Sequence, residues 1–124
     1  MKLPLKTKRW DEPRESDDGL RVLITRYRPR ALPKEDETWD VWWKDLGPSP
    51  GLLKAFQSGL EWNEYRVRYL EEMKSQGEKV GSLARHVAGG QPLTLLCSRF
   101  CVEPLRCHRT LLEKLVRDAA RGRR

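Results

Sequence analysis

The stretch that decides the fold is Leu93-Thr94-Leu95-Leu96-Cys97-Ser98-Arg99, together with the sequence that follows it from Pro104 onward. Residues 93–97 carry no charge, and Pro92 bounds the run on one side. A short apolar run without alternation is typical of a strand buried on both faces, as in a parallel sheet. After Pro104, apolar side chains recur at helical spacing as far as residue 119. The sequence therefore predicts a buried strand, a loop and a final helix.

Working outward, three further segments favour strands. Residues 20–25, Leu-Arg-Val-Leu-Ile-Thr, are short, rich in β-branched side chains and followed by a loop with two prolines. Residues 3–10 alternate apolar and basic side chains, which favours a strand with one exposed face. Residues 38–46 contain three tryptophans and fit a short strand slightly better than a helical turn.

Three helices are predicted between these strands. The first begins at Ser49-Pro50, an N-cap followed by a first-turn proline, and ends at Gly59. The others span about 62–77 and 80–88, where apolar residues repeat at spacings of three and four. Strands that alternate with helices predict an α/β fold: a small, mainly parallel sheet flanked by helices, in a Rossmann-like arrangement of two or three layers. We expect one domain over residues 1–124, with a flexible basic tail from about residue 120.

Composition indicates the compartment of the protein and the charge of its partners. No apolar run approaches the roughly 18 residues that a membrane helix needs, so we expect no membrane partner. Three cysteines are an odd number, which excludes a complete disulfide framework and favours reduced thiols in a cytoplasmic protein. Residues 1–34 and 97–124 each carry a net charge of +5, whereas residues 35–96 carry −3. If the two basic flanks meet, they form a surface suited to phosphate, carboxylate or nucleic acid.

The strongest candidate site combines two segments. In open α/β sheets, ligands bind beyond the carboxyl ends of the strands, often at a helix N-terminus. The loop 26–34 follows one predicted strand, and the start of the last helix follows another. Basic side chains that can clamp an anion, together with a thiol at the strand end, are found in these segments: Arg26, Arg28, Arg30, Lys34, Cys97 and Arg109. We therefore expect an anionic small molecule or a nucleotide to bind there.

The same region could perform thiol chemistry. A helix N-terminus and nearby arginines would lower the pKa of Cys107, and His108 could act as its base or orient it. Against this, His108 lies on the apolar stripe of the last helix, which fits a buried histidine equally well. Cys97 ends an apolar strand and fits an inert buried thiol. Cys101 fits an incidental loop thiol, or a disulfide partner of Cys107.

Other site chemistries find less support. Cys97, Cys101, Cys107 and His108 could supply four zinc ligands, but their spacing lacks the paired short loops of zinc ribbons. In a helix, neighbouring residues 107 and 108 would also point about 100° apart. We therefore expect no metal and no cofactor. A phosphatase loop is excluded because a single residue separates Cys107 from Arg109, and there is no glycine-rich phosphate loop.

Two blocks of the chain carry a resemblance to a known family. One comprises residues 18–30 with Lys34, 43–46 and 48–49, and the other comprises residues 95–97 with Cys107-His108-Arg109. With these blocks, over roughly residues 4–117, the chain resembles the short-chain branch of the domain of unknown function 488 family. The resemblance implies a compact α/β domain with a parallel sheet. The chain departs from that branch where its last helix begins, with Cys107-His108 in place of an Asn-His pair, and at Arg99, where an acidic residue is usual.

Three functions follow as expectations. The first is a small α/β protein that binds a phosphate- or carboxylate-bearing ligand at the strand carboxyl ends. The second is a nucleic-acid-binding module that uses the basic flanks. The third is a thiol-dependent enzyme with Cys107 as nucleophile. The sequence does not indicate which ligand is bound or how many chains assemble.

Overall fold

A computed structural model of the chain describes residues 3–99, 101 and 103–122. Within these ranges, a four-stranded sheet is formed in the order β1-β4-β2-β3, and every adjacent pair is parallel. The strands are β1 (Leu5–Arg9), β2 (Leu20–Leu23), β3 (Val41–Trp42) and β4 (Leu93–Cys97). The predicted α/β fold with a small parallel sheet is confirmed. The stretch at 93–97 forms a central strand buried at every position, as its uncharged sequence predicts.

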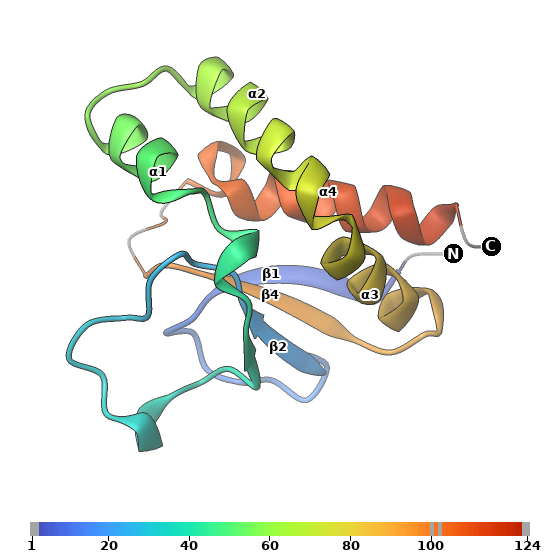
Figure 1. The fold of residues 1–124 in the computed structure, drawn as a ribbon. Coiled ribbons are helices and arrows are strands. Elements are labelled where there is room, and N and C mark those ends of the chain that lie inside the picture. The colour runs from blue at the N-terminus through green and yellow to red at the C-terminus, as the bar shows by residue number, and fades with distance from the viewer. Residues whose placement is uncertain (1–2, 100, 102, 123–124) are drawn as a thin grey trace.

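Helices pack against one face of this sheet. They are α1 (Pro50–Gln57), α2 (Trp62–Met73), α3 (Gly77–Ala88) and α4 (His108–Arg121), and Figure 1 shows them together on one side of the strands. Helix α1 begins as its sequence predicts, with the Ser49 hydroxyl accepting a hydrogen bond from the Leu52 amide. The shared core joins side chains of α2, α3 and α4 to alternate residues of the strands.

The two faces of the sheet differ in chemistry because strand side chains alternate in direction. Leu5, Val22 and Leu95 face the helical core. Their neighbours along the strands include Lys8 and Arg21, which are buried on the opposite face under the loop of residues 10–19. The fold is therefore a two-layer arrangement, with helices on one face and a polar, ion-paired loop on the other.

A carboxylate organises that polar face. Asp18 is fully buried, and its side chain lies 2.8 Å from Lys6 Nζ, 2.9 Å from Lys8 Nζ and 3.1 Å from Arg21 Nη1. The backbone amide of Glu15 also donates to it. Burial by itself raises the pKa of the Asp18 carboxyl, but the hydrogen bonds from Lys6, Lys8 and the Glu15 amide outweigh burial and hold that pKa well below its usual range.

Two segments differ from their prediction. In 38–46, only Val41–Trp42 pairs as a strand, at the edge of the sheet, and Lys44–Leu46 forms a 3₁₀ turn. Gly77, expected to end a helix, instead begins α3 after the 3₁₀ turn Lys74–Gln76. Many helices end at a glycine with a positive φ, whereas Gly77 has a helical φ of −56°.

The C-terminal tail overlaps the last helix. The expected tail of residues 120–124 begins inside α4, which continues to Arg121, and residues 123–124 lie outside the described residues. Across the described part of the chain, none of the helices combines the length and the apolar character required to cross a bilayer.

Gly19 provides a test of how tightly the strands approach each other. Its φ is +61°, and a Cβ at this position would lie 2.2 Å from the Pro92 carbonyl oxygen. Because the clash is with backbone, Gly19→Ala should lower the free energy of unfolding by about 2–3 kcal/mol, measured by urea denaturation. Gly51→Ala is the control, because no atom lies within 4 Å of its Cβ, and it should be neutral or slightly stabilising. Equal stabilities of the two variants would contradict the packing.

Candidate functional site

A cavity of about 970 Å³ opens at the carboxyl ends of the parallel strands. It lies where residue 10 follows β1, the 25–32 loop follows β2, and residues 98–99 follow Cys97 at the end of β4. This is the position at which open α/β sheets bind ligands, and the volume suits a ligand the size of a nucleotide. The loop of residues 26–30 and the start of α4 line the same cavity, as the sequence suggested.

Arg26 lines the cavity but is already engaged. Its Nε donates to the Pro48 carbonyl at 2.9 Å, its Nη2 donates to the Gly47 carbonyl at 3.3 Å, and its Nη1 pairs with Asp45 at 3.2 Å. The approach is close because Gly47 has no side chain: a Cβ there would lie 2.6 Å from the Arg26 backbone nitrogen. Arg26 thus joins the end of β2 to the turn before α1.

Arg28 and Arg30 differ in availability. Arg28 forms an ion pair with Glu37 in which Nε and Nη2 each lie 2.8 Å from Oε2, and its guanidinium sits 5.7 Å from the centre of the Trp39 ring. Arg30 lines the cavity and is exposed, and within the described ranges nothing pairs with its guanidinium. The next residue, Ala31, has a φ of +56°, which is uncommon for a residue with a side chain.

The remaining predicted cations lie elsewhere. Lys34 is exposed at the start of a 3₁₀ turn and does not line the cavity. Arg109 is buried, its Nε has no hydrogen-bond partner among the residues that the structure describes, and it does not line the cavity either. Arg106, which the sequence reasoning did not select, is exposed and does line it. The structure thus brings together Arg26, Arg28, Arg30 and Cys97, but not Lys34 or Arg109.

Aromatic side chains form one wall of the cavity. Phe56 of α1 and Tyr65 of α2 have ring centroids 4.3 Å apart, and both line the cavity. Behind them, Tyr69 stacks on Tyr65 at 6.2 Å and donates its hydroxyl to the Leu46 carbonyl at 2.7 Å. Trp10 and the exposed Tyr27 line the cavity from the strand side. Planar apolar surface beside free cations suits a ligand that has both a ring and an anionic group.

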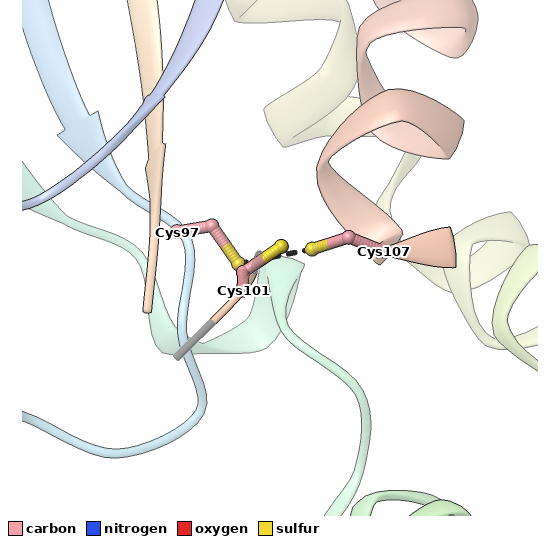
Figure 2. Close-up of side chains that lie close together, drawn as sticks. All are labelled: Cys97, Cys101 and Cys107. Carbon is pink, nitrogen blue, oxygen red and sulfur yellow. Dashed lines mark hydrogen bonds between the residues drawn. The ribbon is translucent and has the colours of Figure 1, made fainter. Parts of the chain in front are cut away.

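The three cysteines gather beside this cavity. Cys97 ends β4, Cys107 is the N-cap of α4, and Cys101 lies on the loop between them; their sulfur atoms converge (Figure 2). The Sγ atoms of Cys97 and Cys107 are 3.1 Å apart, and all three sulfurs lie within 4.8 Å of one another. All three thiols are free. Cys101 therefore belongs to a built cluster and is not an isolated loop thiol.

The predicted lowering of the Cys107 pKa is wrong. Hydrogen bonding to Cys101 and burial raise the pKa of Cys107, while Cys97 and the Arg109 backbone oppose them only in part. The pKa that is lowered is that of Cys101, through hydrogen bonds from the Cys107 and Cys97 thiols and the nearby Arg109 charge. Cys101 is also only partly buried, whereas Cys97 and Cys107 are buried. The thiolate of the cluster is therefore the residue that the sequence reasoning set aside.

His108 is a buried histidine with a defined hydrogen bond. Its Nε2 lies 2.8 Å from the Ile24 carbonyl oxygen, which can only accept, so Nε2 carries the proton. Its Nδ1 lies 3.8 Å from Cys107 Sγ. Burial lowers the pKa of His108 and keeps the ring neutral. The imidazole thus presents an unprotonated Nδ1 to the cysteine cluster.

The basic flanks meet in space, but many of their charges are paired. Arg117 of α4 donates to the Leu5 carbonyl at 2.7 Å and pairs with Glu113 at 2.9 Å. Lys6 and Lys8 of β1 pair with Asp18. A nucleic-acid-binding function for these flanks stays a prediction.

The fold and the site define a class: a small parallel α/β domain with an arginine- and thiol-lined cavity at its strand ends. Comparison with known families identifies the family to which the chain belongs. The family described as "Active DUF488-N3 subclade" matches residues 5–120, and the chain belongs to this family.

Bacterial proteins are similar in sequence to the chain, some over most of its length and others over about half. The uncharacterized protein YeaO of Escherichia coli K12 is 39% identical over 95 residues, which cover 76% of this chain and 82% of YeaO. The uncharacterized proteins Mb3100c of Mycobacterium bovis and Rv3073c of Mycobacterium tuberculosis H37Rv are each 37% identical over 60 residues, covering 48% of this chain and 51% of theirs. No solved structure is significantly similar to the chain.

Proposed function

We propose that the protein binds an anionic ligand of nucleotide size, bearing phosphate or carboxylate, in the cavity at the strand carboxyl ends. The observation that carries the proposal is that the arginine loop of residues 26–30 and the start of α4, about eighty residues later, line one cavity of about 970 Å³. Neither segment forms such a cavity alone.

The charges in the cavity support an anion. Arg30 and Arg106 line it and are exposed, so their guanidinium groups can form bidentate hydrogen bonds with phosphate or carboxylate oxygens. Helix α4 begins at the cavity, and the positive end of its dipole favours negative charge nearby. Arg26 and Arg28, held by Asp45 and Glu37, shape the wall of the cavity.

The aromatic wall supports a ligand with a ring. Phe56, Tyr65 and Tyr27 line the cavity and offer apolar, planar surfaces. A nucleotide has both features that such a site selects: a base that packs on aromatic rings and a phosphate that pairs with arginine.

The proposal is tested by calorimetric titration with adenosine and guanosine 5′-monophosphate, citrate, inorganic phosphate and unphosphorylated adenosine. We expect at least one of the organic anions to bind, and adenosine to bind at least about tenfold more weakly than its monophosphate. Arg30→Gln should weaken binding by about 10–100-fold, because it removes a charge-assisted hydrogen bond. Arg66→Gln, an exposed arginine of α2 that does not line the cavity, is the matched control and should bind as the parent does.

Two results would overturn the proposal. One is the absence of binding by every anion at millimolar concentration, and the other is equal affinity of Arg30→Gln and the parent protein. Binding of generic single-stranded RNA that weakens steeply with salt, in the absence of binding by any small anion, would favour the nucleic-acid alternative in its place.

A further inference from the structure

Three elements of the chain each bring one thiol to the same point. Cys97 comes from the end of β4, Cys101 from the following loop and Cys107 from the residue before α4, and Figure 2 shows their sulfur atoms turned toward one another. The chain contains three cysteines in all, so every thiol it has is in this cluster. Gathering them uses a buried volume that apolar side chains could otherwise fill.

The geometry of the cluster is close to that of a metal–thiolate site. In a tetrahedral zinc site with Zn–S bonds of about 2.3 Å, sulfur atoms lie about 3.8 Å apart. Here all three sulfurs lie within 4.8 Å of one another, and the Cys97–Cys107 distance is 3.1 Å. Side-chain adjustments of less than about 1 Å would reach the metal-bound spacing.

His108 adds an independent observation that points to a metal. Histidines that bind metals usually donate their other ring N–H to a carbonyl or carboxylate, which fixes the tautomer. His108 makes this bond, from Nε2 to the Ile24 carbonyl at 2.8 Å, and its Nδ1 lies 3.8 Å from Cys107 Sγ. The ring nitrogen left without a proton is thus the one on the side of the thiols.

The folded chain removes the two objections to zinc that the sequence spacing raises. Residues 107 and 108 are not both helical, because Cys107 is extended, with φ −142° and ψ 146°. Its side chain can therefore turn to the same side as the ring of His108. A paired short loop is also unnecessary, because β4 and α4 hold Cys97 and Cys107 together without one.

We propose that Cys97, Cys101 and Cys107 bind one Zn²⁺ ion as thiolates, with Nδ1 of His108, 3.8 Å from Cys107 Sγ, as a further donor beside them. Three thiolates and Zn²⁺ carry a net charge of −1, which the buried Arg109 beside Cys101 offsets. Cys97, Cys101, Cys107 and His108 all line the cavity, so the ion would be reached from it. The site goes beyond the proposed anion binding and does not depend on it.

The experiment uses the reduced, chelator-treated protein and the metal alone. Titration with Co²⁺ under nitrogen should produce sulfur-to-cobalt charge transfer and intense visible bands that saturate at one ion per chain. Zn²⁺ should then displace the cobalt and abolish the colour. Cys101→Ser, which changes a partly exposed residue, should weaken Zn²⁺ binding by more than about 100-fold in competition with a chromophoric chelator. His86→Gln, which alters the other histidine of the chain, should bind as the parent does.

Circular dichroism checks that each variant is folded, and Cys107→Ser provides a second ligand substitution if Cys101→Ser is unfolded. The proposal is overturned if the reduced protein gives no thiolate–cobalt bands. It is also overturned if the ion is shared between two chains, or if a folded Cys→Ser variant binds Zn²⁺ as tightly as the parent.

Discussion

Replacing Asp18 by Asn should destabilise the protein at pH 7 by about 3–5 kcal/mol, because it leaves buried cations without their counter-charge. Asp18 is fully buried and lies within 3.1 Å of the charged groups of Lys6, Lys8 and Arg21. Arg21 is also fully buried. The measurement is urea denaturation, and the matched control is Asp17→Asn. That carboxylate pairs with Lys6 at 2.9 Å but is 77% exposed, so its loss should cost less than about 1 kcal/mol.

The effect of Asp18→Asn should depend on pH in a defined direction. The folded-state pKa of Asp18 is lowered, from an ordinary value of 3.8, by its lysine partners and the Glu15 amide. Its stabilisation is therefore complete above about pH 5 and is lost as the pH falls through 3.8 toward the folded pKa. The stability difference between parent and variant should shrink as the pH is lowered below about 4. A difference that is the same at pH 7 and pH 3, or one below about 1 kcal/mol at pH 7, would contradict the buried ion pairs.

Iodoacetamide should label Cys101 far faster than Cys107 in the reduced, metal-free protein. Cys101 is partly exposed, lines the cavity and has its pKa lowered by hydrogen bonds from Cys107 and Cys97. Cys107 is buried and its pKa is raised. Because the thiolate is the nucleophile, the two rates should differ by roughly 100-fold or more at pH 7. Peptide mapping by mass spectrometry gives the rate at each position.

The pH dependence of labelling distinguishes Cys101 from a cysteine with an ordinary pKa. An ordinary cysteine with a pKa of 9.0 reacts about tenfold faster for each unit of pH up to that value. Cys101, already ionised, should react at a nearly constant rate between about pH 6 and pH 8. In the control Cys101→Ser, labelling should fall to the slow rate of the two buried thiols. Rapid labelling of Cys107 at pH 8 would contradict this assignment and would restore Cys107 as the candidate nucleophile.

Much of the fold could be predicted because the decisive signals are local. The uncharged run 93–97 forms β4 with the predicted bounds, and Ser49-Pro50 begins α1. The signals that failed depend on context. A glycine such as Gly77 can start or stop a helix, and its φ decides which. The tryptophans of 38–46 fit a strand, but only Val41 and Trp42 pair, with β2, and the chain enters a 3₁₀ turn at Lys44.

The position of the candidate site could be predicted from the sequence. The ion pairing of its arginines and the pKa values of its cysteines could not. The arginine loop and the start of α4 share a cavity, as the ends of parallel strands require. That Arg26 is occupied by Asp45 and Arg28 by Glu37 depends on partners nineteen and nine residues away, which spacing alone does not reveal. The lowered pKa of Cys101 and the raised pKa of Cys107 likewise arise from contacts among the thiols. The position of Cys107 at a helix N-terminus therefore did not predict its pKa.

The order of the strands has a consequence for how the chain is made. The central strand, β4, is the last to be synthesised, and β1 and β2 pair with it rather than with each other: Leu5 and Leu20 both face Leu93. A chain emerging from the ribosome therefore carries β1 without its partner, and β2 paired only with the short β3, until residue 97 is free. Parallel sheets closed by such late, distant pairing form slowly and expose strand edges meanwhile. The sheet can thus be completed only after its last strand, β4, has been translated.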